Sequence, residues 1–331
     1  MKIISPAVGI LIAMLVAVHT GHAQRTFTVD DFSDRYNAKV FISNIKEVFS
    51  PGWIAIFDKR TKRQLIKVAS DELSFDLENG KIVSNIKELP YGKQSLIIFE
   101  DYNFDGVNDL ALMDGQKSCY HGPSYRVYLG RRSGFTFSPV FTRLAQEYCG
   151  MFSVDEETKK ISTMTKSGCC WHQFSEFVVE NNRPVAVRIV DEAMSQTGLA
   201  WDYTEKVRVS GRMQEKKYSL FNIDELKDSV FFAFEFSNKK KMRLVSQDGV
   251  LHYVFTDKDD KVELIHSDAF VFRRSEDALE FTNGKTIYKV KPAGISVAGP
   301  GTNLDMDATA GTISGSFDKL RDAKFENMIF Q

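Results

Sequence analysis

The chain has 331 residues, with 43 Lys and Arg against 44 Asp and Glu, and its formal net charge is −1. This length is enough for two domains of ordinary size, and the even charge balance argues against binding to nucleic acid or to an anionic membrane surface. With 26 Phe and 11 Tyr against 8 Pro, the composition favours a β-rich globular protein and argues against disorder.

Residues 1–23 have the features of a secretory signal peptide. Lys2 provides a short positive region, and an almost continuous apolar run follows from Val8 to Val18. The small residues Gly21 and Ala23 fit cleavage after Ala23, and the apolar run is too short to span a bilayer. No later apolar stretch reaches membrane length. We therefore expect a periplasmic or secreted mature protein with no membrane span.

Residues 24–210 are predicted to form a first, calcium-binding β domain. Short apolar segments recur at roughly ten-residue spacing with turns between them, and only residues 142–147 have a helical pattern. This organisation is typical of an antiparallel all-β domain, either propeller-like or a sandwich. The expected strands are 38–42, 53–58, 64–68, 96–99, 109–113, 125–129, 150–154, 160–165, 173–179 and 185–190.

The most specific motif is DYNFDGVND at residues 101–109. Oxygen-bearing side chains occupy loop positions 1, 3, 5 and 9, and the glycine at position 6 permits a sharp turn, as in loops that bind a hard cation. An EF-hand needs a glutamate at position 12, where this chain has Leu112, so the loop would close on position 9. The alternative is a metal-free hairpin turn. The predicted Ca²⁺ ligands are Asp101, Asn103, Asp105, Val107 and Asp109.

The four cysteines are Cys119, Cys149, Cys169 and Cys170, and an even number in an exported protein predicts two disulfides. Three pairings are possible. A bond between the adjacent Cys169 and Cys170 would close a strained eight-membered ring. We therefore expect each of these two to bond separately to Cys119 or Cys149, without assigning which to which.

A second dense motif, TKSGCCWH at residues 165–172, is expected at the junction of two strands. A loop pinned by disulfides and presenting Ser, Trp and His suits recognition of a protein partner. The alternative is a buried disulfide core covered by the tryptophan. A soft-metal site formed by Cys169, Cys170 and His172, with His121 as a further ligand, fits less well, because adjacent cysteines suit the tetrahedral geometry of zinc poorly. The predicted partner-binding residues are Ser167, Gly168, Trp171 and His172.

Residues 211–331 are predicted to form a C-terminal β-sandwich-like domain that begins with a polar linker at 211–217. The Asp-Gly pair at 248–249 and the Asn-Gly pair at 283–284 are strong hairpin signals. No nucleophile elbow, phosphate loop or pair of catalytic carboxylates stands out anywhere in the chain. The sequence therefore argues against an enzyme.

The segments at 101–110, 122–129 (GPSYRVYL) and 166–172 together resemble a family of exported bacterial calcium-binding, β-propeller-like proteins. The family is related to immunity proteins that inhibit secreted lysozyme-like peptidoglycan hydrolases. The resemblance covers about residues 36 to 195. It implies bound calcium and a hydrolase or toxin as partner.

Ser167, Gly168 and Trp171 are also similar to the S-G-x-x-Y loop of lysozyme inhibitors, with Trp in place of Tyr. That similarity implies that the loop blocks the catalytic cleft of the hydrolase. The alternative function is that of a carbohydrate- or cell-envelope-binding module without inhibitory activity.

Overall fold

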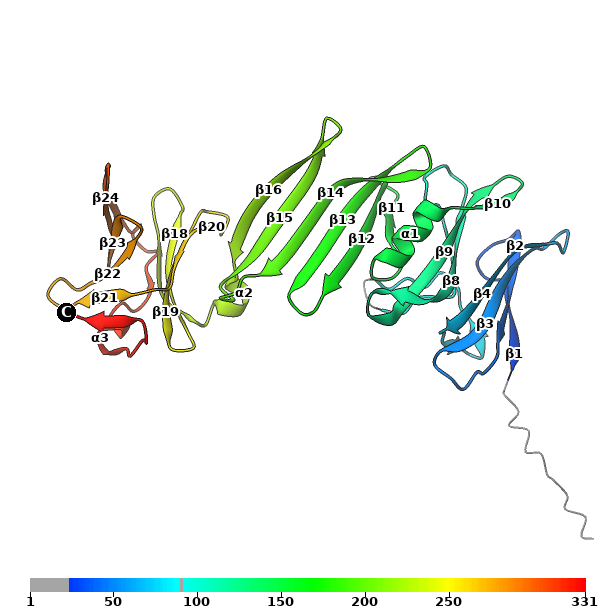
Figure 1. The fold of residues 1–331 in the computed structure, drawn as a ribbon, viewed down its shortest axis with the longest axis horizontal. Coiled ribbons are helices and arrows are strands. Elements are labelled where there is room, and N and C mark those ends of the chain that lie inside the picture. Colours follow the sequence, from blue (N-terminus) through cyan, green and yellow to red (C-terminus); the bar gives the residue numbers. More distant parts are fainter. Residues whose placement is uncertain (1–23, 90–91) are drawn as a thin grey trace, which may run out of the picture. The chain divides into compact units, whose positions relative to one another are not determined.

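The computed structural model describes residues 24–89 and 92–331, and in these residues the protein is all-β with three short α-helices (Figure 1). The predicted fold class is therefore confirmed. The predicted signal peptide lies outside the described residues. No helix in the described part of the chain is long and apolar enough to cross a membrane.

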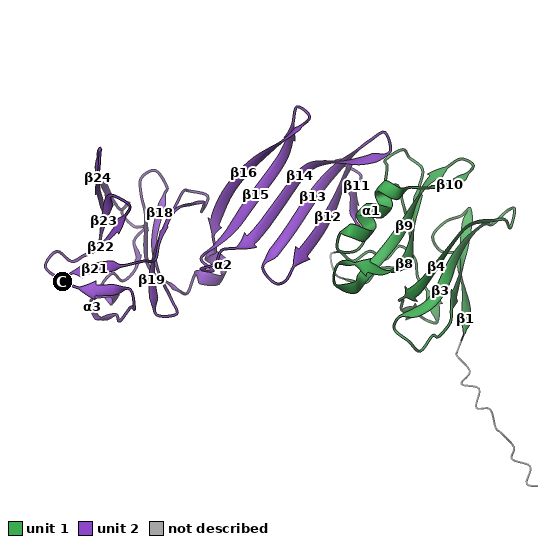
Figure 2. Cartoon of the chain, viewed as in Figure 1, with its two compact units in different colours: residues 1–151 green, residues 152–331 purple. Residues whose placement is uncertain are grey.

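The chain divides into two compact units, one ending at Met151 and the other beginning at Phe152 (Figure 2). The boundary predicted between residues 210 and 211 does not coincide with this division. It falls in a tight hairpin turn inside the second unit, where Ser210 has φ +50° and Gly211 has φ +81°. Residues 212–217 belong to a strand, so their interpretation as a linker was wrong.

The first unit contains two antiparallel four-stranded sheets and a small two-stranded one. The first sheet comprises β1 (Arg25–Val29), β2 (Tyr36–Ile42), β3 (Ser50–Asp58) and β4 (Gln64–Leu73). The second comprises β7 (Ile97–Glu100), β8 (Asp109–Ser118), β9 (Gly122–Arg131) and β10 (Gly134–Phe137). The small sheet pairs β5 (Leu77–Glu78) with β6 (Lys81–Ile82).

Strand alternation explains why these segments form sheets. In β2, Ala38, Val40 and Ile42 are fully buried while Lys39 between them is exposed, which is the period of a strand with one face in the core. Strand β8 is buried on both faces except at Lys117.

The 3-10 helix η1 (Cys119–His121) follows β8, and α1 (Pro139–Glu147) contains the helix predicted at 142–147. It covers β9, whose Val127 N–H donates to Thr142 Oγ1 (2.9 Å).

The second unit begins with a six-stranded antiparallel sheet in which each strand pairs with the next along the chain. Its strands are β11 (Ser153–Asp155), β12 (Lys160–Ser167), β13 (Trp171–Glu180), β14 (Arg183–Met194), β15 (Ala200–Val209) and β16 (Arg212–Phe221). Most residues of β14, β15 and β16 are half-buried or exposed on both faces. Much of this sheet is therefore open to solvent.

The remainder of the second unit is a β-sandwich-like pair of sheets. Buried residues of both sheets, among them Phe232, Phe272 and Phe281, form a single hydrophobic cluster. One sheet contains β17 (Val230–Glu235), β18 (Lys241–Gln247), β19 (Val250–Thr256), β20 (Val262–His266) and β26 (Ser314–Gly315). The other contains β21 (Phe270–Arg273), β22 (Ala278–Asn283), β23 (Thr286–Lys291), β24 (Gly294–Gly299), β25 (Thr302–Asp307) and β27 (Met328–Phe330). Two single-turn helices are α2 (Ile223–Leu226) and α3 (Lys319–Asp322).

Candidate functional site

The predicted calcium loop connects β7 and β8. Its first carboxylate organises the turn: Asp101 Oδ1 accepts the Asp105 N–H (3.2 Å), and Asp101 Oδ2 accepts the Gly106 N–H (2.8 Å). Asn103 Nδ2 donates to Asp105 Oδ2 (2.9 Å). Gly106 has φ +83°, a conformation that favours glycine, so its prediction as the turning residue is confirmed.

The last carboxylate of the loop, Asp109, is fully buried at the start of β8. Its Oδ2 accepts the Tyr102 N–H (2.8 Å), and its Oδ1 accepts the Gly130 N–H from the end of β9 (2.6 Å). Burial raises the pKa of Asp109 to about 7; the two N–H donors lower it, and the nearby charges of Asp101 and Asp105 raise it. Asp109 therefore fastens the loop to the neighbouring strand.

The loop has the donor chemistry of a calcium site, because all its polar side chains present oxygen atoms. However, both oxygens of Asp109 face backbone N–H groups, and the Val107 N–H donates to Asp105 Oδ1 (2.9 Å). Among the residues that the structure describes, no three His, Cys, Asp or Glu side chains are grouped as a metal site. Calcium binding by Asp101, Asn103, Asp105, Val107 and Asp109 stays a prediction.

The disulfides differ from the predicted pairing. Cys119 bonds to Cys149, with Cα atoms 4.8 Å apart, and Cys169 bonds to its neighbour Cys170, with Cα atoms 3.8 Å apart. Cys119 in η1 and Cys149 just after α1 both belong to the first unit, whereas the adjacent pair lies at a hairpin tip of the second unit. The prediction failed because it excluded a bond between adjacent cysteines as too strained, whereas the turn at the hairpin tip accommodates this eight-membered ring.

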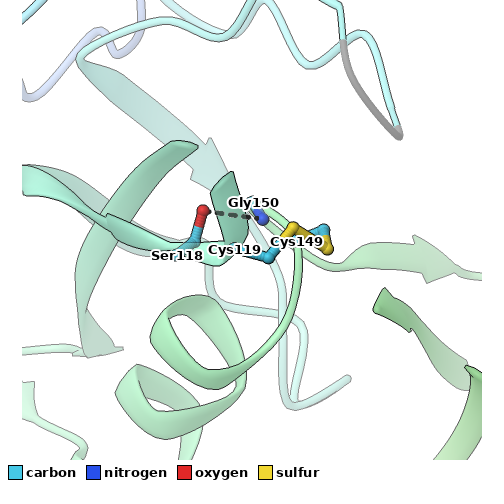
Figure 3. The surroundings of a disulfide bond; sticks show 4 residues. All are labelled: Ser118, Cys119, Cys149 and Gly150. Atoms are coloured by element: carbon cyan, nitrogen blue, oxygen red, sulfur yellow. Dashed lines mark hydrogen bonds between the residues drawn. A yellow bond between two sulfur atoms is a disulfide. The ribbon is translucent and has the colours of Figure 1, made fainter. Parts of the chain in front are cut away.

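The Cys119–Cys149 bond joins the end of β8 to the segment that leaves α1 (Figure 3). Beside it, the Gly150 N–H donates to Ser118 Oγ (3.2 Å). Cys149 is 5% exposed. This disulfide is thus a structural cross-link of the first unit.

The predicted recognition motif forms the tip of the β12–β13 hairpin, where Ser167 pairs with Trp171 across the two strands. The four residues from Ser167 to Cys170 are exposed, and Trp171 is half-buried. Gly168 takes φ +66° at the turn. The interpretation of this motif as a buried disulfide core is therefore wrong. The tip, defined as residues 167–171, is an exposed turn closed by a covalent bond.

His172 is separated from the rest of the predicted recognition residues. Successive side chains of a strand point to opposite faces, so His172 and Trp171 lie on different faces of the sheet. The His172 Nδ1 atom lies 3.1 Å from Glu192 Oε1 on β14. The structure thus brings Ser167, Gly168 and Trp171 together and places His172 in another group of side chains.

Sequence reasoning missed two groups of polar and aromatic residues. One is on the His172 face of the sheet and includes Trp201 and Tyr203, whose alternate spacing in an unrecognised strand was the available signal. The other surrounds Asp114, a buried carboxylate of β8. It accepts hydrogen bonds from Ser124 Oγ (2.7 Å) and Gln146 Nε2 (2.9 Å).

No protein-family model and no curated protein matches the chain. Among solved structures, a Xanthomonas type IV secretion system related protein is 18% identical to this chain. The matched region covers 57% of this chain and 92% of that protein, with a TM-score of 0.43. TolB from Acinetobacter baumannii is 11% identical over 86% of this chain and 66% of its own (TM-score 0.19). A putative 6-phosphogluconolactonase from Bacteroides uniformis is 10% identical over 87% of this chain and 84% of its own (TM-score 0.22). At these TM-scores none of the three supports an assignment of fold or function.

Proposed function

We propose that this chain is an exported binding protein that acts as an immunity-type inhibitor of a peptidoglycan hydrolase. In this proposal the 167–171 tip is the recognition element, and the protein binds its partner without catalysing a reaction. The single observation that carries the proposal is the tip itself: an exposed turn, closed by the Cys169–Cys170 bond, with Trp171 at its base.

Such a tip is suited to fill a cleft. It stands at the end of a hairpin whose strands pair over eight consecutive positions, from Lys160 opposite Val178 to Ser167 opposite Trp171. A turn held by a covalent bond loses little conformational freedom on binding, and this raises the affinity that its contacts deliver. Tryptophan offers a large contact area with few rotatable bonds and is common among residues that dominate binding energy.

The family resemblance suggests which part of the hydrolase each residue of the tip would contact. The Trp171 ring would occupy a sugar subsite of the hydrolase, and the Ser167 hydroxyl would donate a hydrogen bond to a catalytic carboxylate. Gly168 would let the turn approach closely, because it has no side chain and its φ of +66° disfavours other residues. Bound in this way, the tip would exclude the glycan substrate.

The calcium loop has a supporting role in the proposal. It lies in the first unit, whereas the tip is in the second. A calcium ion held by Asp101, Asn103, Asp105, Asp109 and the Val107 carbonyl would fix the β7–β8 connection, and it would supply charge compensation to three carboxylates. In this role the ion is structural, and it does not contact the hydrolase.

Inhibition assays test the proposal directly. The mature chain, residues 24–331, is mixed with a panel of muramidases and other peptidoglycan hydrolases, and lysis of cell walls is followed. We expect inhibition of at least one enzyme and a loss of at least about tenfold in potency, about 1.4 kcal/mol, for Trp171→Ala.

The matched control is Trp201→Ala, because Trp201 lies on the opposite face of the same sheet and should leave inhibition unchanged. Failure to inhibit any hydrolase would contradict the proposal. Direct binding to purified peptidoglycan with no binding to a hydrolase would support the alternative, a carbohydrate- or envelope-binding module.

A further inference from the structure

The face of the six-stranded sheet that carries His172 also carries a row of aromatic and polar side chains. The register places His172, Glu192, Tyr203 and Tyr218 opposite one another on four neighbouring strands, so their side chains share one face. Trp201 is two residues before Tyr203 and lies on the same face. All five are only partly buried, so the row is open to solvent.

A hollow of about 400 Å³ adjoins this row, within the range of small-ligand sites. Trp201 and Tyr203 line its sheet side, together with Glu192. The other side is built from the start of α2 and the β19–β20 turn, and it is held in place because the Phe221 N–H donates to the Asp260 carbonyl (3.0 Å). Both walls belong to the second unit.

The carboxylates of the hollow are already oriented by partners in the protein. Glu192 is held by His172, whose Nδ1 is 3.1 Å from Glu192 Oε1, and it also interacts with the Tyr203 hydroxyl. Asp260 is paired with Lys241 Nζ (2.9 Å) and Arg243 Nη2 (2.6 Å). These oxygens can accept further hydrogen bonds, and Lys241 and Arg243 compensate the negative charge of Asp260.

The residues that line the hollow include Asn222, Asp224 and Asp259 but no Lys or Arg. An anionic ligand would therefore find no cationic side chain in the lining, and a cation would find Asp259 and Asp260 already paired with Lys and Arg side chains. A neutral molecule with an apolar ring face and several hydroxyl donors fits both the aromatic rings and the oriented acceptors. A sugar ring has these properties.

We propose that the hollow beside Trp201 and Tyr203 binds a neutral saccharide. The ring would lie against Trp201 and Tyr203, and its hydroxyl groups would donate to Glu192 and to the carboxylates and amide at the rim. The tip at 167–171 takes no part in this site, because Ser167 and Trp171 occupy the opposite face of the sheet. The inference therefore stands apart from the proposed inhibition of a hydrolase.

The test is a titration of the mature chain, residues 24–331, with two soluble probes: chitotetraose and cellotetraose. The chain has 3 Trp, so binding is followed by tryptophan fluorescence and by calorimetry. We expect at least one probe to bind with a dissociation constant in the millimolar range or tighter. Trp201→Ala should weaken that binding by about tenfold or more, about 1.4 kcal/mol.

Three further variants distinguish the loss of the Trp201 ring from effects on folding or on the other face of the sheet. Trp171→Ala should bind the sugar like the wild type, because it alters the other face. Trp201→Leu keeps apolar bulk and protects the fold while removing the aromatic ring, so it should lose affinity as Trp201→Ala does. Trp201→Phe keeps a ring and should recover part of the affinity. Thermal unfolding of each variant verifies that it is folded.

Several outcomes would overturn the inference. The first is that neither oligosaccharide binds the wild-type chain, and the second is that a folded Trp201→Leu binds as tightly as the wild type. The third is that the hollow instead takes a lysine- or arginine-rich peptide, with binding that falls with salt and with Asp224→Asn. The inhibition assay separates the two proposals, since Trp201→Ala should retain inhibition and Trp171→Ala should retain sugar binding.

Discussion

At the residue scale, Asp109 shows how a residue expected to bind a metal can also be part of the protein scaffold. Its two oxygens accept N–H groups from Tyr102 and Gly130, one in the loop and one at the end of β9. This dual requirement explains the choice of a carboxylate: an amide has only one oxygen and would turn its N–H₂ group toward one of these donors.

We expect Asp109→Asn to reduce stability in two separable ways. In chelator, the loss of one backbone hydrogen bond in a buried site should cost about 1–3 kcal/mol. On addition of calcium at about a hundredfold excess over its dissociation constant, the wild type should gain about 2.7 kcal/mol, whereas Asp109→Asn should gain much less. Urea unfolding with chelator and with calcium measures both effects.

Asn108→Ala is the matched control, because Asn108 is exposed in the same loop at a position that supplies no predicted ligand. It should respond to calcium like the wild type. If the midpoint of urea unfolding of the wild type is the same in calcium and in chelator, the calcium site is refuted. The measurement in chelator would still test the structural role of Asp109.

The burial of His252 leads us to expect that the stability of the second unit depends on pH. Burial lowers its pKa, with Asp248 opposing the shift, and its Nδ1 lies 2.7 Å from Ser267 Oγ. A folded pKa below the unfolded value of about 6.5 means that the neutral ring is favoured by folding. Its contribution to stability is thus complete above about pH 6.5 and is lost as the pH falls through the folded pKa.

Urea unfolding between pH 7 and pH 5 checks this expectation, with pH values chosen around the ordinary histidine pKa. Relative to His252→Gln, the wild type should lose stability toward the acid end. The raised pKa of Asp109, about 7, stabilises both proteins alike as the pH falls, so the difference between them reports on His252. Equal slopes for the two proteins would show that His252 does not contribute to the acid sensitivity.

At the scale of elements, the two disulfides have different roles. Cys119 and Cys149 are 30 residues apart, and closing such a loop in the unfolded chain corresponds to about 3.5 kcal/mol of stability in the chain-entropy description. Cys169 and Cys170 are adjacent, so their bond constrains the unfolded chain little, and the same description gives about 1 kcal/mol or less. The Cys119–Cys149 bond therefore stabilises the first unit, whereas the Cys169–Cys170 bond mainly fixes the conformation of the 167–171 tip.

Two double variants test this contrast. Replacing Cys119 and Cys149 with alanine should lower the free energy of unfolding by several times as much as replacing Cys169 and Cys170. The second replacement should instead weaken hydrolase inhibition, because the tip would lose its fixed shape. Equal losses of stability, or unchanged inhibition after removal of the adjacent pair, would contradict this division of roles.

Element prediction succeeded where one face of a strand is buried. Strand β2 alternates between buried and accessible residues, and the turn pairs at 248–249 and 283–284 do take positive φ at Asp248, Gly249 and Gly284. It failed for β15 and β16. In β15 the alternation of Trp201 and Tyr203 with polar residues was present but not recognised, whereas β16 begins with a mostly polar run, residues 212–217, that resembles a linker because both faces of the sheet are largely accessible.

At the scale of the whole molecule, the candidate sites are distributed between the two units. The calcium loop and the Asp114 cluster belong to the first, and the 167–171 tip and the Trp201 hollow belong to the second. The sequence motifs located the loop and the tip because each is contiguous. They could not locate the hollow, whose walls come from β14, β15, α2 and the β19–β20 turn and meet only in the folded chain.

The most direct test of the central claim is the affinity between residues 24–331 of the chain and an inhibited hydrolase, measured by calorimetry for the wild type, Trp171→Ala and Trp201→Ala. If the tip is the recognition element, Trp171→Ala should lose at least about tenfold in affinity, about 1.4 kcal/mol of binding free energy, and Trp201→Ala should bind like the wild type. A Trp171→Ala protein that is folded and binds with unchanged affinity would contradict the claim.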